Sequence, residues 1–405
     1  MANKQLLTPE HRSRWAVVAA SFAFMFGVWN PYAGFGVFLP VLSQEFGWGR
    51  GAISLAASLN LFIGGVIAFG VGAATDRYGP RGILAVSGLM VGAAYLLASA
   101  VSALWQFYVL LGVLLGIGMS GMYIVPTATV SRWFVRQRGL ALGIVLAGLN
   151  LAYVTGGPLS AVLINGVGWR TAYLLLGGLV LCIALPASLF IKAAPAGNGL
   201  AVSAGETSAT LGEAVKDRRL WLLLMAWLLL GFAVMTVAVH MVPYLHDREL
   251  SLDLASLALT IYGISSLAGR VLFGATADRL GTRPTFWFCA LMQALSLAWV
   301  LTGPSPSVLY ILIMWFGLGA AGSDTAVVKA ASEAFGVRSL GAIMGVVGLG
   351  WRCGAALGPT VAGFLYDLRG SYALPFGLAS AGLMASLVFF TLGMSSPRPS
   401  TNTSR

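Results

Sequence analysis

Twelve apolar stretches fill most of this chain, and each is about 20–25 residues long, enough to cross the roughly 30 Å hydrocarbon core of a bilayer as a helix. Only 9% of the 405 residues are charged, against about 25% in an average soluble domain. The apolar runs also lack the alternation of β-barrel strands. The sequence therefore predicts an all-α integral membrane protein with twelve transmembrane helices. They begin near Trp15, Gly51, Gly82, Leu104, Gly139, Thr171, Leu220, Ala255, Pro284, Val308, Gly341 and Tyr372.

The positions of the basic residues set the orientation. With the N-terminus inside, cytoplasmic segments hold 18 of the 24 Lys and Arg residues, and the outer loops hold only Arg50, Arg170, Arg248 and Arg369. This asymmetry follows the positive-inside rule, so we expect both termini in the cytoplasm. The net charge of +11 is then explained by topology, and we expect no nucleic-acid partner.

The chain contains an internal repeat. The pattern G-x-x-x-D-R-x-G-x-R occurs at residues 72–81 and again at residues 274–283, and a Gly-Pro pair at 157–158 returns at 358–359. We therefore expect two six-helix bundles in parallel repeat, with the binding site between them near the middle of the membrane. The predicted domains are a cytoplasmic leader (1–14), an N-terminal bundle (15–192), a cytoplasmic linker (193–219), a C-terminal bundle (220–392) and a cytoplasmic tail (393–405). Residues 210–216 of the linker are predicted to form a short surface helix.

No pattern in the sequence predicts a cofactor. Two G-x-G-x-x-G matches, at residues 116–121 and 317–322, lie inside apolar spans, where small residues let helices approach each other. A dinucleotide site would need a preceding strand. The three cysteines, Cys182, Cys289 and Cys353, share no close spacing. Hydrolase and metalloprotease motifs are absent, so we expect neither a metal site nor an enzyme.

Arg270 is the most informative single residue. It lies inside the eighth apolar stretch, where a charged side chain costs about 2.5–3.5 kcal/mol to insert. One interpretation is that it faces a water-filled cavity and binds an anion there. The other is that it snorkels to the cytoplasmic surface, but the inner end of the helix is about 12 Å away at 1.5 Å per residue. We favour anion binding, because a guanidinium holds a carboxylate through two parallel hydrogen bonds.

The duplicated loop resembles the signature loop of the major facilitator superfamily, and this likeness covers almost the whole chain. It implies the major facilitator fold and a role for the loops in latching the cytoplasmic gate. The alternative is that the charges only set topology and cap helices. The implied gating residues are Asp76, Arg77, Arg81, Asp278, Arg279 and Arg283.

A narrower likeness begins at Trp133. The run of residues 133–148, WFVRQRGLALGIVLAG, is similar to a pattern of the monocarboxylate transporters and the oxalate:formate antiporters. Arg270 matches the carboxylate-binding arginine of that group. Its first-helix motif is poorly matched by residues 27–30, and Ser266 stands where an acidic partner of the arginine is often found. The likeness implies transport of small organic carboxylates, such as lactate or pyruvate, with proton symport in question.

Arg352 and Asp324 leave the choice of substrate open. Arg352 lies in the eleventh span and Asp324 in the tenth. If Arg352 is a second ligand, the pair of cations suits a dicarboxylate and exchange of the oxalate:formate type. If it pairs with Asp324, one net cation remains, which suits a monocarboxylate. Asp324 is also a candidate proton carrier, as is His240, although a lone histidine is often only hydrogen-bonded structure.

Further candidates for substrate contact lie in the first half. Asn30 precedes Pro31 in the first span, which indicates either a broken helix that lines a cavity or a simple kink with Asn30 bonded to a neighbour. Tyrosine and asparagine side chains either bind substrate or link helices, and leucine and tryptophan offer apolar walls. The first-half candidates are Tyr123, Asn150, Tyr153, Leu149, Trp29 and Asn30.

The resulting hypothesis is a proton-coupled secondary transporter that works by rocking the two halves about the bound anion. Its partners would be the carboxylate, the lipid bilayer, and a proton or a counter-anion. A membrane sensor without transport and an efflux carrier for cationic drugs are weaker alternatives, because no added domain is seen and the cavity carries two arginines against one aspartate. Short loops and tails and the lack of a targeting segment lead us to expect a bacterial inner membrane. We also expect a monomer.

Overall fold

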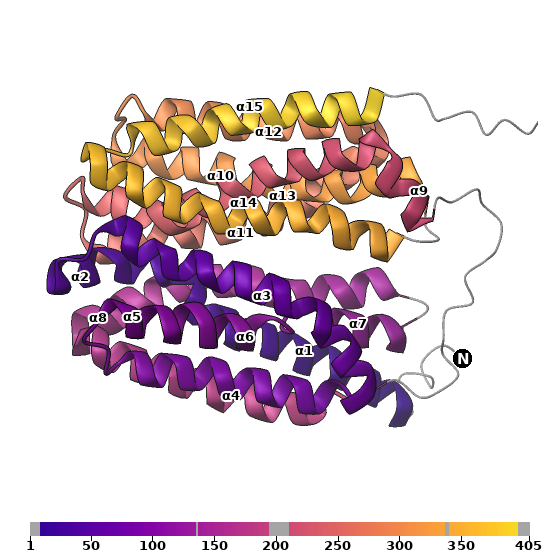
Figure 1. Ribbon diagram of the computed structural model, residues 1–405, viewed down its shortest axis with the longest axis horizontal. Helices are drawn as coiled ribbons and strands as arrows, with labels where there is room; N and C mark the ends of the chain where they lie inside the picture. Colours follow the sequence, from indigo (N-terminus) through magenta and orange to yellow (C-terminus); the bar gives the residue numbers. More distant parts are fainter. Residues whose placement is uncertain (1–8, 135–136, 194–209, 337–339, 396–405) are drawn as a thin grey trace, which may run out of the picture. The chain divides into compact units, whose positions relative to one another are not determined.

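A computed structural model describes residues 9–134, 137–193, 210–336 and 340–395 of the protein. Within these ranges every regular element is a helix (Figure 1). The first half holds α1 (Pro9–Ala33), α2 (Phe35–Phe46), α3 (Arg50–Tyr78), α4 (Pro80–Ala98), α5 (Leu104–Phe107), the π-helix η2 (Tyr108–Leu114), α6 (Leu115–Met119), α7 (Ile124–Trp133) and α8 (Arg138–Phe190). The second half holds α9 (Leu211–Lys216), α10 (Arg218–His246), α11 (Leu252–Leu280), α12 (Thr282–Val300), α13 (Pro306–Phe335), α14 (Leu340–Arg369) and α15 (Ala373–Ser395).

The helices correspond to the twelve predicted spans. Nine stretches of the described chain are long and apolar enough to cross a bilayer. The longest of them, Gly139–Phe190, is two helices, because Gly168 has a φ of 78° and interrupts the helical backbone. Counting its two parts and adding α12 and α14 gives the predicted number. The all-α membrane prediction is therefore confirmed.

The second glycine of each signature loop, Gly79 or Gly281, turns the chain between two helices. Gly79 ends α3 with a φ of 78°, and Gly281 follows α11 with a φ of 92°. Residues with a side chain adopt this region of φ rarely, whereas glycine reaches it without steric cost. The repeat seen in the sequence is thus a repeat of backbone geometry, in which glycine turns the chain between two spans.

The described chain divides into two compact units. Among the described residues, the first unit comprises 9–134, 137–193, 235–264 and 356–375, and the second comprises 210–234, 265–336, 340–355 and 376–395. Four helices, α10, α11, α14 and α15, therefore contribute residues to both units. These units differ from the two halves of the repeat, and the predicted domain boundaries stay a prediction.

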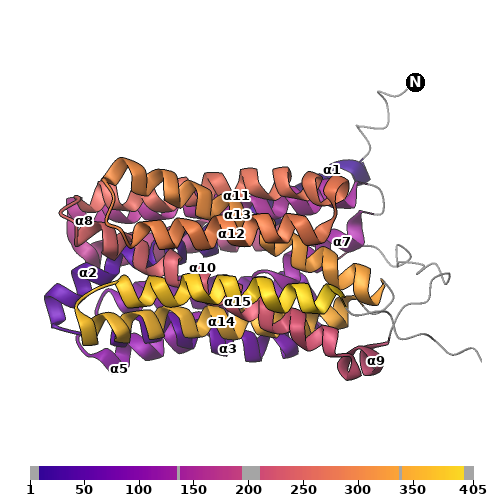
Figure 2. The ribbon, with the colours of Figure 1, turned by 90° about the horizontal axis from the view of Figure 1, so that it is seen from above.

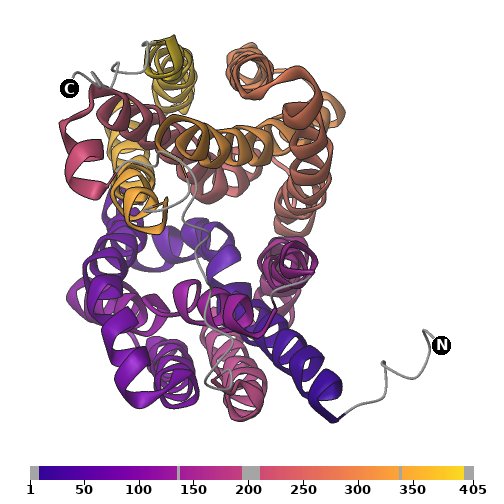
Figure 3. The same ribbon diagram turned by 90° about the vertical axis from the view of Figure 1, so that its right-hand side faces the viewer.

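In the first unit, α8 packs against both α1 and α4. Figure 3 looks along the helices and shows the indigo and magenta helices of the first half gathered as a bundle. Glycine allows a close approach of α8 and α1, since a methyl group on Gly156 of α8 would collide with the carbonyl oxygen of Asn30 on α1. Residues 235–246 of α10, 252–264 of α11 and 356–369 of α14 belong to this unit too. There the Thr260 hydroxyl of α11 donates to the Val154 carbonyl of α8 at 2.7 Å.

The second unit contains α12 and α13, which run side by side (Figure 2). Its core includes Phe286 and Phe390, whose rings stack with centroids 3.8 Å apart. Polar side chains also join the helices, because the Gln293 amide donates to the Ser323 hydroxyl at 2.9 Å.

The short helix predicted in the linker is present as α9. The Thr210 hydroxyl accepts from the Glu213 backbone N–H, and the Glu213 carboxylate accepts from the Thr210 backbone N–H at 2.7 Å. This capping box satisfies donors that a helix N-terminus leaves without partners. The leader and tail predictions fall largely on residues outside the described ranges, as does most of the linker.

Candidate functional site

Arg270 lies on α11 where this helix touches α13 in the second unit. The two helices are in close contact here, as a methyl group added to Gly269 would collide with the Leu318 carbonyl oxygen of α13. The Arg270 side chain is 39% exposed, and its Nη2 lies 3.8 Å from Oδ2 of Asp324. Its Nε is buried and has no hydrogen-bond acceptor. Sequence reasoning treated Arg270 as an unpaired cation, whereas the fold brings an aspartate to it.

Asp324 is held from two sides. Its Oδ1 accepts a hydrogen bond of 2.9 Å from the indole N–H of Trp227 on α10, while Oδ2 faces Arg270. At 3.8 Å the contact with Arg270 is an ion pair without hydrogen-bond geometry. The carboxylate is therefore oriented by Trp227 and only loosely attached to Arg270. Arg352 lies half-buried on α14 in the same unit, and its predicted role as a second ligand stays a prediction.

The first unit gathers an aromatic cluster that includes two predicted substrate residues. The ring of Trp29 lies 4.8 Å from that of Tyr32 and 6.1 Å from that of Tyr153, and Tyr153 in turn lies 5.3 Å from Tyr262 on α11. All four side chains are buried. The hydroxyl of Tyr32 and the indole N–H of Trp29 have no hydrogen-bond partner. Sequence reasoning missed Tyr32 and Tyr262, because neither position carries a local signal of function.

The other first-half candidates have varied surroundings. Asn30 is buried and its amide donates to the Thr155 hydroxyl of α8 at 2.7 Å, which is the link between helices that the sequence analysis left open. Asn150 is buried on α8, whereas Leu149 is half-buried and Tyr123 is 45% exposed. Substrate contact by any of these residues stays a prediction.

His240 is fully buried on α10 and takes part in three hydrogen bonds. Its Nδ1 lies 3.0 Å from the Tyr372 hydroxyl, and its Nε2 lies 2.8 Å from the Pro359 carbonyl oxygen and 3.2 Å from the Ser54 hydroxyl. A carbonyl only accepts, so Nε2 carries a proton and Nδ1 is free to accept from tyrosine. These contacts match the interpretation of His240 as hydrogen-bonded structure. Its role as a proton carrier stays a prediction.

The second signature loop has a partner that the sequence did not reveal. Lys329 of α13 donates to Asp278 at 2.6 Å and to the Ala277 carbonyl at 2.7 Å. The Arg283 guanidinium lies 4.9 Å from the centre of the Trp287 ring. The side chain of Asp76 lies outside the described residues. The gating role of both loops stays a prediction. The exposed members of the predicted set are Arg77, Arg81, Asp278 and Arg279.

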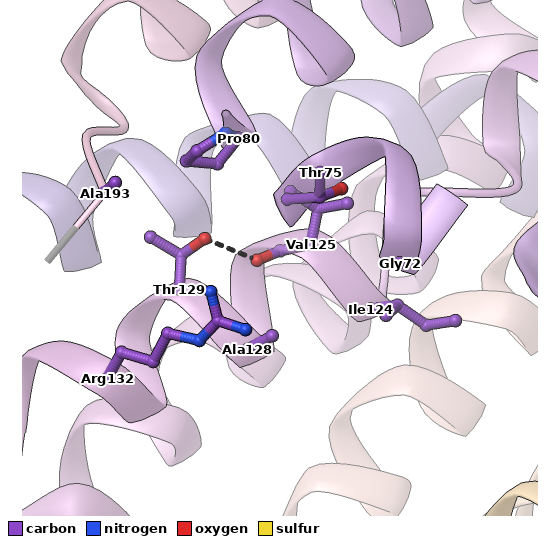
Figure 4. Close-up of a pocket in the computed structure, with 9 residues that line it drawn as sticks. All are labelled: Gly72, Thr75, Pro80, Ile124, Val125, Ala128, Thr129, Arg132 and Ala193. Carbon is purple, nitrogen blue, oxygen red and sulfur yellow. Dashed lines mark hydrogen bonds between the residues drawn. The ribbon is translucent and has the colours of Figure 1, made fainter. Parts of the chain in front are cut away.

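A small cleft of about 130 Å³ lies beside the first signature loop (Figure 4). The Thr129 hydroxyl in its wall donates to the Val125 carbonyl at 2.7 Å, and the Thr75 hydroxyl donates to the Val71 carbonyl at the same distance. Both hydroxyl protons are therefore already used. The cleft contains no predicted substrate residue. Its lining residues are Gly72, Thr75, Pro80, Ile124, Val125, Ala128, Thr129, Arg132 and Ala193.

Known proteins resemble the chain over nearly its full length. It is 29% identical over 392 residues to monocarboxylate transporter 13 of Bos taurus, which covers 93% of this chain and 89% of that protein. It is 27% identical over 397 residues to monocarboxylate transporter 11 of Homo sapiens, covering 95% and 84%. It is also 26% identical over 372 residues to the uncharacterized MFS-type transporter YcxA of Bacillus subtilis (strain 168), covering 90% and 91%.

Solved structures share the fold at low identity. A bacterial homolog of the human lysosomal transporter Spinster, in an inward-facing and unoccupied conformation, matches with a TM-score of 0.74 and 15% identity over 96% of each chain. A point mutant of the nucleoside transporter NupG matches with a TM-score of 0.76 and 12% identity, covering 95% of this chain and all of that one.

The model of the Major Facilitator Superfamily matches residues 17–255 and 241–405. These ranges include both signature loops, whose glycines make the same turn in each half of the repeat. The relatives are membrane transporters rather than enzymes, which confirms the prediction that the chain is not an enzyme. The protein therefore belongs to the Major Facilitator Superfamily.

Proposed function

We propose that the protein is a proton-coupled transporter of small monocarboxylate anions that works by alternating access. The observation that carries this proposal is the loose ion pair between Arg270 and Asp324 within the spans. The names of the relatives support the substrate class. A guanidinium offers five donors, and an ion pair without hydrogen bonds leaves them available for a substrate carboxylate.

Charge balance gives the mechanism. Arg270 and Asp324 together carry no net charge. When a carboxylate docks on Arg270 through two parallel hydrogen bonds, Asp324 loses its cation, and one proton on Asp324 returns the site to neutrality. A neutral site is less costly to move through an apolar environment than a charged one. One proton would therefore accompany each monocarboxylate.

Uptake into proteoliposomes tests this coupling. We expect an inward proton gradient to drive accumulation of labelled lactate or pyruvate in the wild type. Arg270→Lys keeps the charge but loses the planar fork, so uptake should fall about tenfold or more. Asp324→Asn should abolish gradient-driven accumulation and retain exchange of internal for external substrate. Glu45→Gln and Arg170→Lys, which alter an exposed outer pair, serve as matched controls.

Two outcomes would contradict the proposal. Wild-type activity of Arg270→Lys would show that Arg270 does not hold the carboxylate. Full gradient-driven accumulation by Asp324→Asn would show that the proton travels elsewhere, and His240→Gln would be the next variant.

Exchange of a dicarboxylate for a monocarboxylate is the second candidate, because Arg352 supplies another cation in the same unit. Exchange predicts that uptake is independent of the proton gradient and requires an anion inside the vesicles. It also predicts that Arg352→Gln loses oxalate transport and keeps formate transport. A monomer in a bacterial inner membrane is our proposal for state and location.

A further inference from the structure

Arg50 is the centre of a network at the outer ends of the helices in the first unit. It is the first residue of α3, and its guanidinium donates two hydrogen bonds to the Asp247 carboxylate, at 2.7 and 2.6 Å. It also donates to the Tyr372 hydroxyl at 2.9 Å and lies 4.0 Å from the centre of the Tyr366 ring. Asp247 follows α10, Tyr366 lies near the end of α14 and Tyr372 precedes α15. One arginine of the first repeat thus binds three segments of the second.

Asp367 makes an independent connection at the same place. One of its carboxylate oxygens accepts from the backbone N–H of Arg50 at 2.9 Å, and the other accepts from that of Gly51 at 2.8 Å. The first amides of a helix have no partner within the helix, and Gly49 at the N-cap of α3 has no side chain to supply one. An aspartate of α14 therefore caps α3. We call Arg50, Asp247, Asp367 and Tyr372 the outer latch.

The contact continues inward along one face of α3. Ser54 lies one turn below Arg50 and contacts His240 at 3.2 Å, and Ser58 lies another turn below and contacts the Thr360 hydroxyl at 2.5 Å. Residues four apart share a face of a helix, so α3 presents a continuous polar stripe to α10 and α14. The Tyr372 hydroxyl joins the two levels, because it accepts from Arg50 and lies 3.0 Å from His240.

The polar stripe of α3 and the residues of α10 and α14 that it contacts form a polar seam, and such a surface suits a contact that opens and closes. Apolar surfaces lose their favourable burial when they separate in water. Hydrogen bonds are exchanged for bonds to water, so the net cost of separating each one is small. Charged side chains gain further hydration. The seam between α3 and the outer ends of α10 and α14 can therefore hold the segments together without fixing them permanently.

From this arrangement we infer that the outer latch is the outer gate of the transport cycle. When its ion pair and its cap are formed, the outer ends of the two repeats are joined. When they break, α3 separates from α10 and α14 and exposes the polar stripe to the outer solution. This inference rests on the alternating access proposed above, but it does not depend on which substrate is carried.

Cysteine labelling tests the latch without any substrate. Ser58→Cys is introduced into protein that carries Cys182→Ala, Cys289→Ala and Cys353→Ala, and a membrane-impermeant maleimide is added to the outside of oriented vesicles. Ser58 is only 7% exposed, so labelling of the parent protein should be slow. Arg50→Gln should speed labelling about tenfold, which corresponds to about 1.4 kcal/mol of lost latch stability.

The chain provides a matched control. Arg170 is also an outer arginine with an ion pair and an aromatic contact, but its partners Glu45 and Trp169 lie within the first repeat. Arg170→Gln should leave the labelling rate within twofold. Exchange of the two charges, as Arg50→Asp with Asp247→Arg, should return the rate toward that of the parent protein.

The outcomes separate the latch from the proposed substrate. Faster labelling of Arg50→Gln without carboxylate uptake by the parent protein would support the latch and refute the substrate. An unchanged rate in a folded Arg50→Gln variant, or an equal rise in Arg170→Gln, would overturn the latch. If Arg50→Gln does not elute as a single species in size exclusion, Asp247→Asn, which leaves the cap of α3 intact, becomes the deciding variant under the same criteria.

Discussion

The indole of Trp227 is predicted to set how strongly Asp324 competes with the substrate for Arg270. In Trp227→Phe a smaller aromatic ring replaces the indole, and the 2.9 Å hydrogen bond to Oδ1 of Asp324 is lost. The freed oxygen can turn toward Arg270 and change the loose 3.8 Å contact into a hydrogen-bonded pair. A substrate carboxylate must then displace a stronger competitor, so its apparent affinity should fall.

The structure sets the size of this effect. A hydrogen bond to a charged group contributes about 1.5–3 kcal/mol. The Asp324 side chain is 30% exposed, and solvent weakens such interactions. We therefore take the lower end, about 1.5 kcal/mol, which is about tenfold in an equilibrium constant. The KM for lactate should rise about tenfold, with little change in the maximal rate.

The assay is initial-rate uptake into proteoliposomes over a range of lactate concentrations. Trp221→Phe is the matched control, because Trp221 lies on the same helix and its indole donates to the Val215 carbonyl at 2.9 Å, away from Asp324. In an Asp324→Asn background, Trp227→Phe should have much less effect, because the competing charge is gone. An unchanged or lower KM in Trp227→Phe would refute this reasoning.

Three further predictions concern stability. Gly156→Ala should lower the unfolding temperature in detergent, because overpacking where α8 meets the backbone of α1 costs about 1–3 kcal/mol, whereas Gly143→Ala, with open space around it, should not. Burial disfavours the charged form of Asp217, but hydrogen bonds from the neighbouring Arg219 outweigh the effect of burial and hold the pKa of Asp217 below the ordinary 3.8. The charged Asp217 therefore stabilises the fold at neutral pH. This stabilisation is lost as the pH falls through the lowered pKa. Asp217→Asn should accordingly be less stable than the wild type at pH 7, and this difference should shrink as the pH is lowered below 3.8; a pH-independent difference would contradict this. Lys329→Gln should speed hydrogen exchange at the end of α11, because it loses the ion pair to Asp278; unchanged exchange there would show that the pair does not hold this end.

The sequence determined those features of the protein that depend on near neighbours along the chain. Hydrophobic length predicted the spans, and basic residues in the loops predicted the orientation. The repeated loop predicted two related halves, and Gly79 and Gly281 make the same turn in each of them. The short helix at residues 210–216 was predicted from the local sequence, and its capping box joins Thr210 and Glu213, which lie within four residues. In each case the physical cause lies within a short segment, so the feature can be predicted from the local sequence alone.

Only the tertiary structure decided which side chains meet. Arg270 was recognised from the cost of a charge in a membrane, but its neighbours Asp324 and Trp227 come from two other helices. Arg50 was counted as one basic residue in an outer loop, yet Asp247 and Asp367 reach it from more than 190 residues away. A charged or hydrogen-bonding side chain in the sequence indicates that a partner is needed. The choice of partner depends on how the helices pack, and that is settled by contacts over the whole fold.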